Sequence, residues 1–179
     1  MPDQGQSAET FEELALPLFD QLYNFAQWLT HNAPEAEDLV QETYVKALRG
    51  FSGFQLGTNF RAWMFRILRN TFLTSRTGLK SAAMSDDEVD FEIIPSAAPS
   101  PEGVIIAQAN RELVRQGLTD LPLPYREILL LVEVEEMSYE EIAQVLAVPV
   151  GTVMSRLYRA RRALRALLAE KFKGASNGL

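Results

Sequence analysis

The apolar residues near the N-terminus follow a helical period. Between residues 11 and 29 they recur at steps of three and four. They are Phe11, Leu14, Leu18, Leu22, Phe25 and Leu29. Pro17 interrupts this row, and because proline has no amide hydrogen to donate, the pattern predicts a helix that begins or kinks there.

Two more helices are expected before residue 77. Pro34 lies where the first turn of a helix tolerates proline, and residues 35–49 continue that helix with one apolar side. Gly50, Gly53 and Gly57 mark residues 50–59 as a loop. A third helix is expected from Phe60 to about Ser75.

The helical pattern stops after residue 77 and returns near residue 102. The intervening segment is acidic, contains several prolines and shows no sustained period, which is typical of an interdomain linker. Helices are expected again over 103–118, from about Pro124, over 138–148 and over 151–172. No segment alternates with a period of two, so the predicted fold class is all-α, with two small helical domains. The predicted bounds are 8–77 for the first domain, 78–101 for a flexible linker, 102–173 for the second domain and 174–179 for a disordered tail.

Residues 137–164 have the layout of a helix-turn-helix. Ser138 can cap a helix whose third residue is Glu141, which forms a capping box. A short turn over 147–150 follows, and Gly151 and Thr152 open a longer helix. The spacing therefore predicts two helices that cross closely.

The last helix has two different faces. One is apolar and is expected to lie in the core: Val153, Leu157, Ala160, Leu164, Leu167 and Leu168. The other carries small polar residues near the helix N-terminus and arginines one and two turns further on. Such a face suits phosphates and base edges in the major groove, although a helix-turn-helix can also bind protein. The candidate DNA-binding residues are Thr152, Ser155, Arg156, Tyr158, Arg159, Arg161 and Arg162.

The formal net charge of −7 hides four blocks of alternating sign. Residues 1–42 carry net −9, residues 43–85 net +7, residues 86–150 net −11 and residues 151–179 net +6. Two basic blocks with almost no acids favour two contacts with a polyanion, rather than a merely solvated surface.

The first basic block includes the predicted helix that begins at Phe60. Arg66, Arg69 and Arg76 share one face, and Trp63 and Asn70 share a flank. Aromatic and amide groups beside arginines suit single-stranded or melted nucleic acid, in which a base leaves the stack. The alternative, that these aromatic residues belong to the core, stays open.

The composition excludes several kinds of site. The chain has no cysteine and one histidine, His31, so zinc sites and the common pairs of nucleophile and base cannot be assembled. No metal, no cofactor and no enzymatic activity are expected. The N-terminus does not resemble a secretory leader and no window is apolar enough to insert in a membrane, so a cytoplasmic protein is expected.

Three motifs together are more specific than any one of them. The segments AEDLVQETYVKAL, GTNFRAWMFRILRNTF and SYEEIAQVLAVPVGTVMSRLYRARRAL occur in this order, with the linker between the second and third. They resemble bacterial RNA polymerase sigma factors of the extracytoplasmic-function (ECF) group, over about residues 11–168. The resemblance implies two helical domains, region two and region four, that bind the polymerase core and direct it to promoters.

The resemblance also assigns roles to residues. Residues 38–43 are similar to the surface that docks on the clamp helices of the largest polymerase subunit, and the expected contacts are Asp38, Leu39, Gln41, Glu42 and Thr43. The loop 51–59 and the helix after it are similar to the part that captures a flipped base of the minus-10 element. The expected contacts there are Asn59, Arg61, Trp63, Arg66, Arg69, Asn70 and Arg76. The stretch 151–162 is similar to the minus-35 recognition helix, except that Met154 stands where relatives often have Lys or Arg.

The implied partners are the polymerase core, through its clamp helices and flap, promoter DNA and an anti-sigma factor. One competing hypothesis is a sigma mimic that titrates an anti-sigma factor without binding promoters, and another is a stand-alone helix-turn-helix repressor. The acids of the linker are expected to imitate nucleic acid in the polymerase cleft, or to serve only as a spacer: Asp86, Asp87, Glu88, Asp90, Glu92 and Glu102. A linker of this composition predicts neither an open nor a packed arrangement of the two domains.

Overall fold

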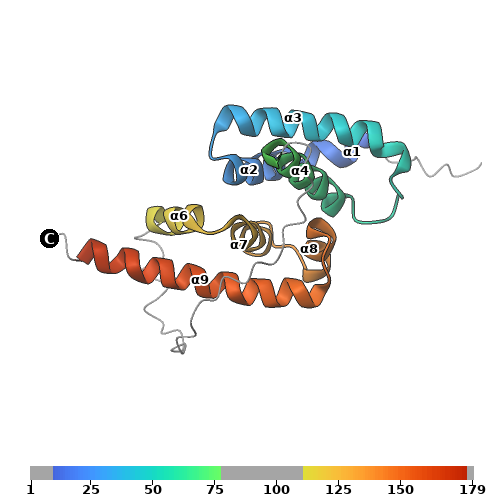
Figure 1. The fold of residues 1–179 in the computed structure, drawn as a ribbon. Coiled ribbons are helices and arrows are strands. Elements are labelled where there is room, and N and C mark those ends of the chain that lie inside the picture. Colours follow the sequence, from blue (N-terminus) through green and yellow to red (C-terminus); the bar gives the residue numbers. More distant parts are fainter. Residues whose placement is uncertain (1–9, 78–110, 177–179) are drawn as a thin grey trace, which may run out of the picture.

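The computed structural model describes residues 10–77 and 111–176, and Figure 1 shows how their helices are arranged. Within these two segments the regular structure is helical and no strand occurs. The all-α prediction is therefore confirmed. The predicted linker with its acids, the first part of the helix expected over 103–118 and the last residues of the chain lie outside the described residues.

The N-terminal domain is a small bundle whose breaks lie where proline and glycine predicted them. A capping box between Thr10 and Glu13 begins the first helix, and Pro17 lies in a 3-10 turn that separates it from the second. Asn32 caps the next helix, which has Pro34 in its first turn. The elements are α1 (Phe11–Ala15), η1 (Leu16–Leu18), α2 (Phe19–Thr30), α3 (Ala33–Gly50), η2 (Phe51–Gly53) and α4 (Phe60–Thr77).

The core of this domain is aromatic and aliphatic. Phe25 of α2 and Phe65 of α4 are buried with their ring centroids 5.4 Å apart. Phe11 packs edge-on against Phe51 and Phe60. Phe65 is fully buried and Phe72 is also buried, because α4 packs on both α2 and α3.

The C-terminal domain places three short elements on one long helix. Gly117 allows α6 to approach α9 closely, since a Cβ atom there would lie 3.1 Å from Leu168 and 3.2 Å from Leu164. The long helix continues to Ser176, beyond the point where a tail was expected to begin. The elements are α6 (Arg111–Asp120), α7 (Leu123–Leu129), a π-turn η3 (Leu130–Val134), α8 (Tyr139–Leu146) and α9 (Val150–Ser176).

The predicted helix-turn-helix is present as α8, a tight turn and α9. Ser138 and Glu141 form the expected capping box. The turn depends on Ala147, whose φ of 55° is left-handed, and on a hydrogen bond of 3.1 Å from the Val148 amide to the carbonyl of Ala143. The fully buried side chains of Val153 and Ala160 confirm the apolar face predicted for α9.

The two domains are packed together. The elements α6, α7 and α8 lie between α4 and α9, so that α9 is on the outer side of the molecule (Figure 1). Helices α4 and α8 are in direct contact. The sequence left this arrangement open, and the contacts described below account for it.

Candidate nucleic-acid and polymerase-binding surfaces

The outer face of α9 is open along its first turns. Met154 is 54% exposed and Tyr158 is 61% exposed. Ser155 is exposed, and its hydroxyl donates to the carbonyl of Thr152 over 3.1 Å. The guanidinium of Arg162 lies over the Tyr158 ring at 5.7 Å. These residues form a continuous polar and cationic surface, which we call the outer face.

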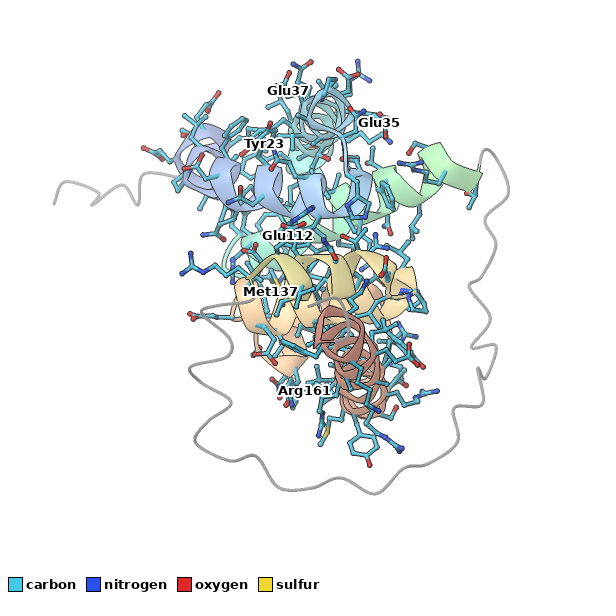
Figure 2. The ribbon with its side chains drawn as sticks, turned by 90° about the vertical axis from the view of Figure 1, so that its left-hand side faces the viewer. Tyr23, Glu35, Glu37, Glu112, Met137 and Arg161 are labelled. Carbon is cyan, nitrogen blue, oxygen red and sulfur yellow. The ribbon has the colours of Figure 1, made fainter. Side chains whose placement is uncertain are left out.

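The flanks of α9 differ in their contacts. The Arg161 guanidinium donates to the carboxylate of Glu133 over 2.7 Å, and both side chains remain about half exposed. Figure 2 shows Arg161 on α9, on the side of the C-terminal domain away from α2 and α4. The Nε of Arg159 lies 3.5 Å from the carbonyl of Ser155 in its own helix. Arg156 is half-buried.

Part of the basic side of α4 is covered by the other domain. The guanidinium of Arg69 donates from Nε to one carboxylate oxygen of Glu127 over 2.8 Å and from Nη2 to the other over 3.0 Å. The side chain of Arg69 is 12% exposed and that of Glu127 is 1% exposed. A bidentate pair of this kind is a strong and geometrically specific contact.

Arg61 makes a second contact across the same interface. Its Nη2 donates to the backbone carbonyl of Glu135 over 2.7 Å and approaches a Glu135 carboxylate oxygen at 3.2 Å. Its Nε donates to Gln21 of α2 over 2.9 Å. Burial raises the pKa of Glu135 above its usual range, and the positive charge of Arg61 only partly opposes this effect.

Asn59 makes the third contact, at the N-terminus of α4. Its side-chain carbonyl accepts from the Ala62 amide over 2.8 Å, which caps the helix. Its side-chain amide donates to the carboxylate of Glu141 over 2.7 Å. Burial alone would raise the pKa of Glu141, but hydrogen bonds from Asn59 and Ser138 and the charge of Arg61 hold it below its usual value.

The remaining candidate residues of α4 are more open. Trp63 is half-buried and packs on Phe54 and Phe60 at centroid distances of 4.9 Å and 5.5 Å. Its environment is therefore that of a residue packed on one side and open on the other. Arg66 and Asn70 are exposed.

Arg76 lies near the C-terminal end of α4. Its guanidinium pairs with Glu35 of α3 over 3.0 Å, and both side chains are about half exposed. Arg76, Asp38, Glu42 and Phe72 border a shallow hollow between α3 and α4. This hollow connects the acidic face of α3 with the open end of α4.

The predicted docking residues on α3 divide into two groups. Asp38, Gln41 and Glu42 are exposed, as a contact surface requires. Leu39 is 6% exposed and Thr43 is fully buried, with its hydroxyl donating to the Leu39 carbonyl over 2.7 Å. These two side chains face the core of the domain in this structure, and their contact with polymerase stays a prediction.

The residues that occupy α4 were not found from the sequence. Glu127, Glu135 and Glu141 belong to the acidic block 86–150, whose excess charge was the only signal of a cationic counterpart. Nothing in the helical pattern distinguishes these three acids from the exposed Glu133, Glu136 and Glu140 nearby. We call the first three the interface acids and the second three the outer acids.

One further contact joins the domains at their other end. Arg126 of α7 donates to the backbone carbonyls of Leu118, Thr119 and Leu121 at 2.8–3.0 Å, and its Nη1 lies 2.9 Å from Nε2 of His31 at the end of α2. Burial and the nearby Arg126, Arg115 and Arg76 lower the pKa of His31. A neutral His31 can accept a hydrogen bond from the Arg126 guanidinium.

The described residues contain no cluster of three or more histidine, aspartate or glutamate side chains placed to hold a metal ion. None of the described helices is both long and apolar enough to cross a membrane.

Comparison with known protein families gives two matches in the expected order. The family described as Sigma-70 region 2 matches residues 17–81, and the family described as Sigma-70, region 4 matches residues 111–164. The ECF RNA polymerase sigma factor EcfG of Rhodopseudomonas palustris is 39% identical over 144 residues, which are 80% of this chain and 77% of that protein. The chain belongs to the ECF sigma factor family. Sigma factors of this kind are transcription initiation factors and not enzymes: they direct RNA polymerase to promoters.

Other similar proteins agree with this assignment. The ECF sigma factor SigE of Mycolicibacterium smegmatis is 34% identical over 161 residues, which cover 90% of this chain but 62% of SigE. Among solved structures, the sigma factor RpoE of Bartonella quintana, in complex with the anti-sigma factor NepR, has a TM-score of 0.67 and 31% identity, with 89% of this chain and 96% of RpoE covered. CnrH in complex with the cytosolic domain of CnrY has a TM-score of 0.63 and 26% identity, with 89% of this chain and 88% of CnrH covered.

Proposed function

We propose that this ECF sigma factor divides its work among three surfaces. The outer face of α9 reads the minus-35 element, α4 and the loop before it engage the minus-10 element, and the exposed acids of α3 dock on the polymerase core. The observation that carries the proposal is the separation of these surfaces, since α9 and α3 lie on opposite outer sides of the molecule with α4 between them (Figure 1).

The role of α9 follows from side chains that are exposed, such as Ser155 and Tyr158, or partly exposed, such as Thr152 and Arg159. Thr152 and Ser155 lie in the first turns of a long helix, where short polar groups can meet phosphates or base edges. The Nε of Arg159 makes a long contact of 3.5 Å with the Ser155 carbonyl of its own helix, so the guanidinium can turn toward a guanine. Exposed Met154 adds apolar surface where a cation would neutralise a phosphate.

The role of α3 follows from charge and exposure. Asp38, Gln41 and Glu42 are exposed on one side of α3, over a core that includes Leu39 and Thr43. Acidic side chains on a rigid helix are suited to a cationic protein surface, and they are poorly suited to DNA. The buried pair positions the exposed residues and makes no direct contact in this account.

We also propose that an anti-sigma factor controls this protein. RpoE of Bartonella quintana, which resembles it over most of its length, was solved with an anti-sigma factor, and CnrH was solved with the cytosolic domain of CnrY. The site of action is the cytoplasm, where polymerase and chromosomal DNA are found. The domain bounds 8–77 and 102–173 remain predictions.

In vitro transcription with purified polymerase core tests the proposed function. A sigma factor starts transcripts at specific promoters, whereas a sigma mimic or a stand-alone repressor does not. The double variant Asp38→Ala, Glu42→Ala should lose core binding in a pull-down. Glu37→Ala on the same helix, also exposed, is the matched control and should retain it. Equal binding by the two variants would remove α3 from the docking surface.

A further inference from the structure

The two cationic surfaces of this chain differ in their exposure to solvent. On α9 the outer face is exposed, whereas on α4 Asn59, Arg61 and Arg69 are bound by carboxylates of the other domain. This difference does not come from the charge of the two helices, since both basic blocks have a similar excess of positive charge. It comes from where the interface acids lie.

The contacts on α4 have the chemistry of a nucleic-acid complex. The guanidinium group of arginine presents a planar fork that fits a carboxylate and a phosphate in the same bidentate manner. Glu127 occupies that fork on Arg69, with both of its oxygens within 3.0 Å of the guanidinium nitrogens. A phosphate cannot use the same fork while Glu127 is in place.

Each interface acid is directed at the N-terminal domain. Glu127 is 1% exposed and forms its ion pair with Arg69. Glu135 is buried and faces Arg61. Glu141 does cap α8, but it uses its second carboxylate oxygen for Asn59. Removal of Arg69 and Arg61 would leave the buried carboxylates of Glu127 and Glu135 without a cation, which is unfavourable.

Two acids at the π-turn η3 reach different helices. The amide of Glu135 donates to the carbonyl of Leu130 over 3.0 Å, five residues back, so the chain gains one residue relative to an α-helix. Glu133 pairs with Arg161 of α9, while Glu135 pairs with Arg61 of α4. The fold thus directs one acid to each cationic helix.

We propose that Glu127, Glu135 and Glu141 act as an internal substitute for the promoter strand, which masks Asn59, Arg61 and Arg69 of α4 in the free chain while leaving the outer face of α9 accessible. Separation of the two domains is then a required step before the minus-10 element is engaged. This inference rests on the proposed role of α4 in DNA binding. It covers only part of that helix, because Arg66 and Asn70 remain exposed.

Two triple variants test the proposal. In the first, the interface acids are changed by Glu127→Gln, Glu135→Gln and Glu141→Gln. In the control, the outer acids are changed by Glu133→Gln, Glu136→Gln and Glu140→Gln. Both variants lose the same charge from the same region, and the control acids are exposed. Glutamine at position 141 can still form a capping box with Ser138, so α8 keeps its N-terminal cap.

The first measurement is the distance between the domains in the full chain. Because the protein has no cysteine, one label can be placed by Glu37→Cys on α3 and another by Ala169→Cys on α9, both at exposed positions. The proposal predicts a longer label distance in the interface variant than in the wild type and the control variant. An unchanged distance in the interface variant would overturn it.

The second measurement is binding of a fluorescent single-stranded DNA of random sequence. The interface variant should bind about ten-fold more tightly than the control variant, since it exposes two arginines and an amide that can contact phosphates and bases. Equal affinities in a variant whose domains have separated would show that the covered face of α4 is not a DNA surface, and would contradict the proposal. If the triple variant is insoluble, Glu135→Gln with Glu141→Gln should change both readouts in the same direction, and no change in either would again contradict it.

In vitro transcription distinguishes failure of the masking proposal from failure of the proposed function. A wild-type chain that starts transcripts with polymerase core, combined with an interface variant that neither opens nor gains DNA affinity, keeps the function and removes the masking. A wild-type chain that starts no transcripts removes the function, whatever the label distance shows.

Discussion

Helices α4 and α9 both carry an excess of positive charge, but the other domain covers part of that charge on α4. The Arg69 side chain on α4 is 12% exposed, whereas the Arg161 side chain on α9 is 44% exposed, although each is paired with a glutamate of the C-terminal domain. A basic sequence therefore does not by itself provide an available nucleic-acid surface. Availability depends on where the acids of the same chain lie after folding.

The difference should have energetic consequences. A buried pair has given up its hydration, so removing one partner leaves an uncompensated charge, whereas an exposed pair contributes little.

Arg69→Ala should have the largest effect on stability. It leaves the carboxylate of Glu127 buried without a cation, and the expected loss in unfolding free energy is roughly 3–5 kcal/mol, limited by the free energy that holds the domains together. The matched change Arg161→Ala on α9 should cost less than about 1 kcal/mol, because its pair with Glu133 is solvated. Urea denaturation of both variants provides the measurement. Equal losses would mean that the α4 interface is no more important than a surface contact.

Arg159→Ala should reduce promoter use without changing the packing of the domains. If Arg159 reads a base, the expected loss is roughly 1–3 kcal/mol in promoter binding by the holoenzyme. Transcription from promoters that differ only in the minus-35 element measures the effect. A variant that still ranks those promoters as the wild type does would show that Arg159 does not read the minus-35 sequence.

Met154→Lys should strengthen the outer face of α9. A lysine at this exposed position can neutralise one more phosphate, which should steepen the slope of log affinity against log salt by about 0.9. Titration of duplex DNA at several salt concentrations tests this, with Ala166→Lys on the same helix as a control for added charge. Identical salt slopes for the two lysine variants would show that position 154 does not face the DNA backbone.

Acidic pH should loosen the domain interface, with the smallest effect of the four. The groups that face His31 are Arg126 of α7, Arg115 of α6 and Arg76 of α4, and together with burial they lower its pKa from 6.5. Because the packed state favours neutral His31, its contribution is complete above about pH 6.5 and is lost as the pH falls toward the lowered value. The raised pKa of Glu135 acts in the opposite direction, since protonation of that carboxyl is easier in the packed state.

His31→Gln provides the control for this pH effect. Glutamine is neutral at all of these pH values and offers an acceptor for Arg126. The distance between labels on α3 and α9 should therefore increase from pH 7.5 to pH 5.5 in the wild type and change less in the variant. A wild-type distance that is independent of pH would exclude His31 from the control of domain packing.

Much of each domain could be predicted from the sequence, because the signals are local. The capping box at Ser138 and Glu141, the break at Pro17 and the apolar stripe of α9 depend on residues within a few turns of one another. The site was predicted less completely. Leu39 and Thr43 lie four residues apart on one side of α3, which could have suggested that they are buried, whereas Asp38 and Glu42 are exposed. The resemblance to a docking motif assigned the same role to all four residues.

The domain interface could not be predicted, for a physical reason. The pair of Arg69 and Glu127 joins residues 58 positions apart, and that of Asn59 and Glu141 joins residues 82 positions apart. The π-turn η3 lies between Glu127 and Glu141, and no residue pattern in the sequence predicts it. The acidic block was visible in the sequence, but the identity of the cations beside each acid was not.

The contrast between α4 and α9 can be tested in a single sample by chemical modification of arginines. The free chain would be treated with a dicarbonyl reagent and each modified arginine identified by mass spectrometry. The account predicts slow reaction of Arg61 and Arg69, and fast reaction of Arg66 on the same helix and of Arg161 on α9. If Arg69 reacts as fast as Arg66 in the free chain, the basic face of α4 is not covered, and the central claim is contradicted.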